Sequence, residues 1–264
     1  LADFEKEYLL LPSGDLQREK HKNHYHYFLR EEDKKRRYLS KKEKYGIIVL
    51  GSATDPYLQL EKDVCLTREL LSIILKYRFP LHIITKSDLI IRDIELLKEI
   101  SKNGILPDDL KGKLKSSLAV SFSFSTIEND ISKIFEPGAT MPSQRIETIK
   151  LMLAEGFNCG ISMMPLLPYI TDTSASLEAM YGMFSGIGVN YLFGAGLTLF
   201  GNTPADSRVL MFNAVKKHYP QLYGKYEKLF GNSDYLPAFY SNALSKKLFD
   251  LNRKYGIPAQ ITVK

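Results

Sequence analysis

The sequence predicts an α/β fold in which parallel strands alternate with outer helices. Short apolar runs rich in β-forming residues begin 31 to 40 residues apart, and segments with helical periodicity lie between them. One strand–helix–strand unit takes about 30 residues or more, so each interval has room for one crossover helix. The predicted strands are Ile47–Leu50, Leu81–Thr85, Leu118–Phe124, Asn158–Met164 and Val189–Phe193. We therefore expect five parallel neighbours in one curved sheet.

The segments between these strands have the apolar spacing that is typical of amphipathic helices. In Val64–Lys76, the residues Leu66, Leu70, Ile73 and Ile74 recur at spacings of three and four positions. The other predicted elements are helices over Ile91–Ile100, Ser143–Ala154, Thr173 or Ser174 to Phe184, Pro204–His218, Gln221–Phe230 and Ser241–Tyr255, and a last strand over Ala259–Val263.

The composition is that of a globular protein, with 44% hydrophobic and 25% charged residues in a chain of 264. Apolar runs are shorter than the roughly 18 residues that a membrane-spanning helix needs, and no signal-peptide pattern is present. We expect a cytoplasmic protein with no membrane partner. Cys65 and Cys159 are too few for a disulfide framework, and neither has a second cysteine at metal-ligand spacing. We expect them to form no disulfide and to bind no metal.

The first 45 residues are polar and do not fit the alternating pattern. The run Lys34–Arg37 supplies part of the net charge of +6. A basic run of this kind is either a solvated face or a patch that contacts the phosphates of a nucleic acid. His21, His24 and His26 form a histidine cluster, but a zinc site needs a further ligand, so a surface segment is the favoured interpretation.

Polar residues follow the ends of several predicted strands. Ser52, Thr54 and Asp55 follow the first strand, Lys86 the second, Ser121 and Ser123 end the third, and Met163 ends the fourth. The carboxyl ends of parallel strands meet at one rim, so these side chains are expected to converge there. An aspartate suits an ammonium group and a lysine suits a carboxylate, which is the pattern of a site for a zwitterionic amino acid.

Most of these residues also have a structural interpretation. Ser52, Thr54 and Asp55 precede a proline, as in an ordinary turn or helix cap. Lys86 has Asp88 nearby as a surface partner, and methionines such as Met163 occur more often in a core than in a ligand-binding wall.

A set of ordered motifs accompanies the predicted strands and helices. The motifs are Gly51-Ser52-Ala53-Thr54-Asp55-Pro56-Tyr57, Glu61-Lys62, Leu66-Thr67-Arg68, Ile83-Ile84-Thr85-Lys86-Ser87-Asp88, Arg92-Asp93, Glu136-Pro137-Gly138-Ala139 with Arg145, Met163-Met164-Pro165-Leu166-Leu167-Pro168, Thr171-Asp172, Tyr219-Pro220, Tyr226 and Phe230-Gly231-Asn232-Ser233. Together they resemble the spore photoproduct lyase-like group of radical S-adenosylmethionine proteins. The resemblance covers roughly residues 46–264.

This resemblance implies a partial (β/α)6 barrel that lacks its first strand and its cluster loop. Residues 1–45 would be a polar segment downstream of that loop, residues 46–218 the partial barrel, and residues 219–264 a helical extension packed on it. The implied cofactors are S-adenosylmethionine and a [4Fe–4S] cluster. The family's C-x₃-C-x₂-C loop is not in this chain, so the cluster ligands are expected upstream of Leu1, and the chain alone is expected to be inactive.

The resemblance also implies roles for individual residues. Ser52, Thr54 and Asp55 occupy the position that meets the methionyl amine. Lys86 and Ser121 or Ser123 occupy positions that meet the methionyl carboxylate, and Arg145 is a weaker candidate for the same group. No hydrogen-donating or catalytic residue is assigned.

Three functions follow as hypotheses. The first is a radical enzyme that cleaves S-adenosylmethionine reductively to methionine and a 5′-deoxyadenosyl radical, abstracts hydrogen from an unknown substrate, and needs an electron-donor protein. Nucleic-acid repair is one form of it. The second is a non-catalytic barrel that binds an amino-acid-like ligand or a protein partner. The third is an unrelated barrel with a phosphate site, for which Gly194-x-Gly196 is a faint signal.

Overall fold

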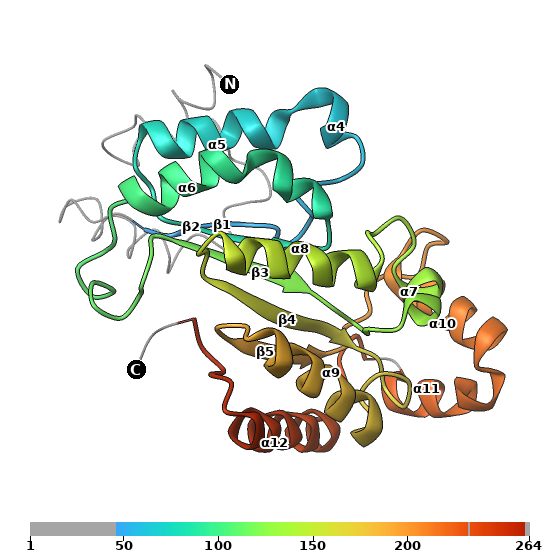
Figure 1. The fold of residues 1–264 in the computed structure, drawn as a ribbon. Helices are drawn as coiled ribbons and strands as arrows, with labels where there is room; N and C mark the ends of the chain where they lie inside the picture. Colours follow the sequence, from blue (N-terminus) through green and yellow to red (C-terminus); the bar gives the residue numbers. More distant parts are fainter. Residues whose placement is uncertain (1–45, 232, 262–264) are drawn as a thin grey trace, which may run out of the picture.

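The computed structural model describes residues 46–231 and 233–261 and shows a sheet of five parallel strands covered by helices (Figure 1). The strands are β1 (Ile48–Leu50), β2 (Leu81–Thr85), β3 (Leu118–Ser123), β4 (Cys159–Leu166) and β5 (Leu192–Gly196). Their spatial order follows their order in the chain, and each consecutive pair is parallel. The prediction of five parallel neighbours is confirmed.

The ends of β1, β3, β4 and β5 differ from the predicted ends, most of all in β5, and the predicted last strand is wrong. β5 begins at Leu192 instead of Val189, because Asn190 is tied to the start of β4 by its side chain, whose Oδ1 accepts from the backbone N–H of Cys159 at 2.9 Å. Residues 259–261 form a bend instead of a strand. Pro258 accepts a hydrogen bond from Leu192, but proline has no N–H with which to continue a ladder. Residues 262 and 263 lie outside the described part.

Helices follow the strands as predicted, with changes at their ends. They are α4 (Glu61–Val64), α5 (Leu66–Lys76), η3 (Asp88–Asp93), α6 (Ile94–Asn103), α7 (Asn129–Phe135), α8 (Pro142–Ala154), α9 (Ser174–Ile187), α10 (Ser207–His218), η4 (Pro220–Leu222), α11 (Tyr223–Phe230) and α12 (Ala238–Tyr255). The predicted helix from Val64 is interrupted at Cys65, which has a left-handed φ of 54°. The predicted helix from Ile91 starts as a 3₁₀ turn, and α7 was not predicted.

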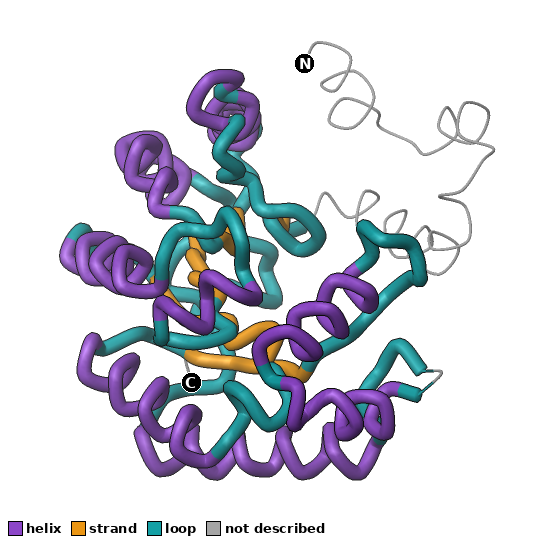
Figure 2. The backbone as a smooth tube through the Cα atoms, turned by 90° about the vertical axis from the view of Figure 1, so that its right-hand side faces the viewer, coloured by secondary structure: helices purple, strands orange, loops and turns teal. Residues whose placement is uncertain are grey.

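The main core lies between the sheet and the helices on its outer face. Figure 2 shows these helices as an arc around the strands. Alternate strand residues such as Val120, Phe122 and Ile161 are fully buried against helix residues such as Ile149 of α8 and Leu177 of α9. Since successive strand residues point to opposite faces, the residues between them face the inner side of the curved sheet.

The inner face carries a chain of hydrogen-bonded polar groups. The Ser121 hydroxyl lies 2.8 Å from Nε2 of His82 and 2.9 Å from the Tyr191 hydroxyl. The Tyr191 ring lies over Gly160 of β4, where an added Cβ would come within 2.2 Å of ring carbons. Burial lowers the pKa of His82 to about 4, so its imidazole is neutral at pH 7. We call His82, Ser121 and Tyr191 the inner chain.

Candidate functional site

A cavity of about 640 Å³ opens at the carboxyl ends of β1 and β2. Its walls come from the loop after β1, the loop after β2 and the segment that leads into α8. The lining residues are Asp55, Tyr57, Leu58, Gln59, Lys62, Lys86, Ser87, Asp88, Leu89, Pro137, Gly138, Ala139, Thr140, Met141 and Gln144. Asp55 and Lys86 therefore line one cavity although they are far apart in the sequence. We call this space the rim cavity.

Asp55 joins the first two strand ends. Its Oδ1 accepts from the Tyr57 N–H at 2.9 Å and from the Thr85 hydroxyl at 2.7 Å, and its Oδ2 accepts from the Lys86 N–H at 2.6 Å. A carboxylate has about four acceptor positions. Within the described part of the chain, Oδ2 thus keeps one position for a donor in the rim cavity, such as an ammonium group.

Lys86 belongs to a charged cluster with Glu136 and Arg145. Its Nζ lies 3.3 Å from Glu136 Oε1, and its side chain is 28% exposed. Glu136 Oε2 accepts from the fully buried Arg145, whose guanidinium also donates to the backbone carbonyl of Ser123 and lies 4.6 Å from the centre of the Phe124 ring. Lys86, Glu136 and Arg145, which we call the charged cluster, combine two cations with one carboxylate. The excess positive charge is on Lys86, which lines the cavity.

Glu136 is held ionised by these neighbours. Burial alone raises the pKa of its carboxyl, but the Arg145 guanidinium and the Lys86 ammonium, with a hydrogen bond from the Ser125 N–H, hold that pKa below its ordinary range. The Ser132 hydroxyl donates to Oε2 at 3.2 Å. The carboxylate is therefore a fixed negative charge that orients the two cations.

The structure places the other predicted site residues away from the rim cavity. Ser52 and Thr54 are exposed and are not among its lining residues. Ser121 is fully buried in the inner chain, and Met163 is fully buried in the main core. Arg145 is a buried member of the charged cluster, and the buried Ser123 contacts that cluster through its backbone carbonyl. Of the eight predicted residues, Asp55 and Lys86 line the cavity.

Sequence reasoning assigned no role to three groups that shape this site. Glu136 was noted only within a family motif; the Pro-Gly that follows it indicates a turn, but not the burial of the carboxylate. Thr140 donates to Asp88 at 2.9 Å and so joins the segment before α8 to the loop after β2. The Tyr57 ring lines the cavity while its hydroxyl is buried, and burial, followed by the Asp93 carboxylate, raises its pKa.

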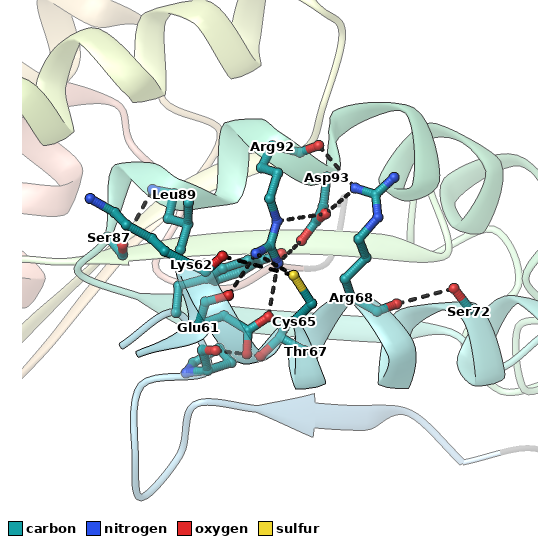
Figure 3. Close-up of polar contacts among 12 residues, drawn as sticks. Glu61, Lys62, Cys65, Thr67, Arg68, Ser72, Ser87, Leu89, Arg92 and Asp93 are labelled. Carbon is teal, nitrogen blue, oxygen red and sulfur yellow. Dashed lines mark hydrogen bonds and ion pairs between the residues drawn. The ribbon is translucent and has the colours of Figure 1, made fainter. Parts of the chain in front are cut away.

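A second ionic network lies close to the loop after β1 (Figure 3). Arg92 donates to the Glu61 carboxylate at 2.8 Å and to Asp93 Oδ2 at 2.9 Å, and Arg68 lies 2.5 Å from Asp93 Oδ1. Thr67 of α5 donates to the backbone carbonyl of Pro56. The ion pairs connect α4 and α5 to the 3₁₀ turn after β2, and the Thr67 bond ties the loop that carries Asp55 to α5.

The described residues do not fit an iron–sulfur cluster. Within residues 46–231 and 233–261, no three His, Cys, Asp or Glu side chains come together as a metal site. Cys159 is buried in β4, and burial raises the pKa of its thiol to about 12, which opposes the thiolate form that such clusters require. Cys65 lies between α4 and α5, with Arg92 Nη1 3.7 Å from its sulfur.

Comparison with known proteins gives relatives without an assigned function. No protein-family model matches the chain. An uncharacterised protein of Mycobacterium tuberculosis is 27% identical over 211 residues, which are 80% of this chain and 57% of that protein. An uncharacterised protein of Methanocaldococcus jannaschii is 32% identical over 127 residues, which are 48% of this chain and 43% of that protein.

Solved structures share the fold. A mutant of spore photoproduct lyase with bound AdoMet and dinucleoside spore photoproduct has a TM-score of 0.53 and 14% identity, over 84% of this chain and 62% of the lyase. The lyase complexed with the dinucleoside spore photoproduct gives the same values. The chain thus spans less than two thirds of these proteins. Its α/β fold, with five parallel strands and outer helices, resembles part of a radical S-adenosylmethionine barrel. Among the described residues, no helix is long and apolar enough to cross a membrane.

Proposed function

We propose that this chain is the S-adenosylmethionine-binding part of a radical S-adenosylmethionine enzyme. The observation that supports the proposal most is the rim cavity, where Asp55 and Lys86 present opposite charges from neighbouring strand ends. Lys86 would hold the methionyl carboxylate and Asp55 Oδ2 the methionyl ammonium. When bound beside a reduced cluster, S-adenosylmethionine would supply a 5′-deoxyadenosyl radical for hydrogen abstraction.

The charges of the cavity support this orientation of a zwitterion. Glu136 is already paired with Arg145, so Lys86 keeps positive charge that an incoming carboxylate can balance. Asp55 is fixed by three hydrogen bonds and does not need to move to accept a fourth. Because the described cysteines do not form a cluster site, the cluster ligands belong, in this proposal, to a segment upstream of Leu1.

The substrate and partners are part of the proposal. The lyase whose fold this chain shares binds a dinucleoside spore photoproduct, so we propose a nucleic acid as the substrate class of this protein. An electron-donor protein is proposed as the partner that reductive cleavage needs. The basic run Lys34–Arg37, which would contact phosphates, lies outside the described residues. If the run Lys34–Arg37 contacts phosphates, the affinity for nucleic acid should fall steeply as the salt concentration rises. Replacing its four basic residues should then remove that dependence.

The test is S-adenosylmethionine binding to the natural full-length protein, reconstituted anaerobically with iron and sulfide. Lys86→Met removes the ammonium but keeps the apolar stem. A hydrogen bond to a charged group contributes roughly 1.5–3 kcal/mol, so we expect affinity to fall about ten- to a hundredfold.

Lys133→Met is the matched control, because Lys133 is an exposed lysine of α7 outside the cavity. Arg68 is less suitable, since it pairs with the buried Asp93. Equal affinities of the two variants would refute the role of Lys86. Release of 5′-deoxyadenosine under reducing conditions separately tests the radical chemistry. Binding without release would favour the non-catalytic barrel.

A further inference from the structure

A second cavity, of about 330 Å³, lies between the loop after β4 and the first half of α12. Its lining residues are Tyr169, Asp172, Thr173, Phe239, Tyr240, Ala243, Leu244 and Lys247. The rim cavity, where we propose that the cofactor binds, shares none of these residues. We call this space the aromatic cavity.

Three aromatic rings form its apolar part. Tyr169 and Tyr240 meet edge to face with ring centres 5.8 Å apart, and Phe239 meets Tyr240 in the same way at 6.4 Å. The Phe239 side chain, in the first turn of α12, is 71% exposed and so presents a large apolar surface to solvent. An exposed ring beside a cavity offers a stacking surface for a flat ligand.

A buried carboxylate supplies hydrogen-bond acceptors in this cavity. Asp172 is 7% exposed, its Oδ1 accepts from the Tyr169 N–H at 2.7 Å, and its Oδ2 accepts from the Tyr240 hydroxyl at 2.6 Å. Within the described residues each oxygen therefore keeps an acceptor position. A donor on a bound ligand would fill a position that is costly to leave unpaired.

Lys247 supplies the complementary donor. Its Nζ donates to the backbone carbonyl of Asp172 at 3.2 Å, which holds the ammonium beside the carboxylate and leaves two of its three N–H groups for other acceptors. The aromatic cavity thus presents a donor and an acceptor next to each other, at the edge of a stacking surface.

The charges restrict the ligand class. A quaternary ammonium ion, the usual guest of an aromatic cage, would meet Lys247, and the ring of Tyr169 already has the Lys225 ammonium 4.9 Å from its centre. A simple anion would meet the Asp172 carboxylate. A neutral planar ring with an N–H and a carbonyl on adjoining atoms satisfies both Asp172 and Lys247, and it stacks on Phe239.

We infer that the aromatic cavity binds a planar nitrogen heterocycle through an N–H and carbonyl edge. Such a ring occurs in free nucleosides and in the bases of a single strand. The site does not depend on S-adenosylmethionine, so its test stands apart from the test of the proposed function.

The experiment titrates the full chain with uridine and with N3-methyluridine, which lacks the N–H donor, and follows binding by calorimetry without cofactor. We expect saturable binding of uridine and at least tenfold weaker binding of the methylated compound. Phe239→Leu, which removes the stacking ring, and Lys247→Met, which removes the donor, should each weaken uridine binding about tenfold.

Two residues of the same helix give matched controls. Phe249→Leu changes a ring that is 59% exposed, and Lys246→Met changes a lysine whose side chain is 79% exposed; both lie outside the cavity and should leave binding unchanged. Any of three results would overturn the inference: a lack of saturable uridine binding, equal binding of the two nucleosides, or equal losses of affinity in the test and control variants. A single-stranded oligouridylate that binds much more tightly than uridine, in a salt-dependent way, would identify a strand as the source of the ring; equal affinity would identify a free nucleoside.

Discussion

Ser121 and Ser123 lie two positions apart on β3, yet they belong to polar clusters of different kinds. Ser121 joins the inner chain, whose groups are neutral and satisfy one another. The backbone carbonyl of Ser123 accepts a hydrogen bond from Arg145 of the charged cluster, where two cations face one carboxylate. A balanced neutral chain fills the inside of the sheet, whereas an unbalanced charged cluster leaves an interaction for a ligand. The difference predicts a graded series of mutational effects.

The largest effect is expected in the charged cluster. Glu136→Ala leaves the fully buried Arg145 without its carboxylate, and an unpaired buried charge costs about 3–5 kcal/mol of unfolding free energy. Urea unfolding measures it. The double variant with Arg145→Met should recover part of that loss, because the uncompensated charge is gone. A single variant as stable as the natural chain would show that the cluster is not a coupled unit.

The inner chain should respond to pH instead. The pKa of His82 is about 4 in the fold and near 6.5 in an unfolded chain, so the unfolded state takes up the proton first as the pH falls. His82 therefore costs up to about 3 kcal/mol of stability between pH 6.5 and pH 4, and nothing above pH 6.5.

The measurement compares the natural chain with His82→Gln, which can still hydrogen-bond to Ser121. The variant should lose less stability over this pH range, by up to about 3 kcal/mol. Parallel curves for the two proteins would mean that His82 is protonated equally in both states. This outcome would remove the claim that the inner chain is neutral.

A smaller effect is expected where the inner chain packs on β4. Gly160→Ala places a methyl group in the Tyr191 ring, and overpacking of this kind costs about 1–3 kcal/mol. Gly186→Ala in α9 is the matched control. No atom lies within 4 Å of its added methyl group, so this change should be neutral or stabilise by up to about 1 kcal/mol. Equal effects in thermal unfolding would argue against close packing at Gly160.

The smallest effect belongs to one neutral hydrogen bond. Tyr191→Phe removes the hydroxyl that meets Ser121 and should cost about 1 kcal/mol, since Ser121 keeps its contact with His82. A loss as large as that of Glu136→Ala would erase the distinction between the two clusters. The comparison uses the same urea unfolding curves.

The sheet was predictable because β2, β3 and β4 are short runs rich in apolar and β-forming residues at regular intervals. The break at Cys65 was not, because a left-handed residue between two amphipathic turns leaves the apolar spacing intact. α7 has seven residues, which is too short for a periodic signal to stand out.

The candidate site was predictable only in part. Asp55 and Lys86 follow consecutive strands, so topology alone brings them together. Glu136 meets Lys86 across 50 positions, and no local pattern specifies that pairing. Strand alternation placed Ser121 on the inner face. Its partners could not be read from β3, because His82 lies on β2 and Tyr191 immediately precedes β5.

Asp55 has one more consequence for ligand binding. Two of its three hydrogen bonds join the loop after β1 to the end of β2, and the third, from the Tyr57 N–H, lies within the loop itself. Ordering a flexible loop on binding costs conformational entropy that reduces affinity, whereas a loop already held in place adds no such cost. In the proposed function the Asp55 carboxylate therefore preorganises the rim cavity, and the attraction between Lys86 and the methionyl carboxylate can appear almost entirely as affinity.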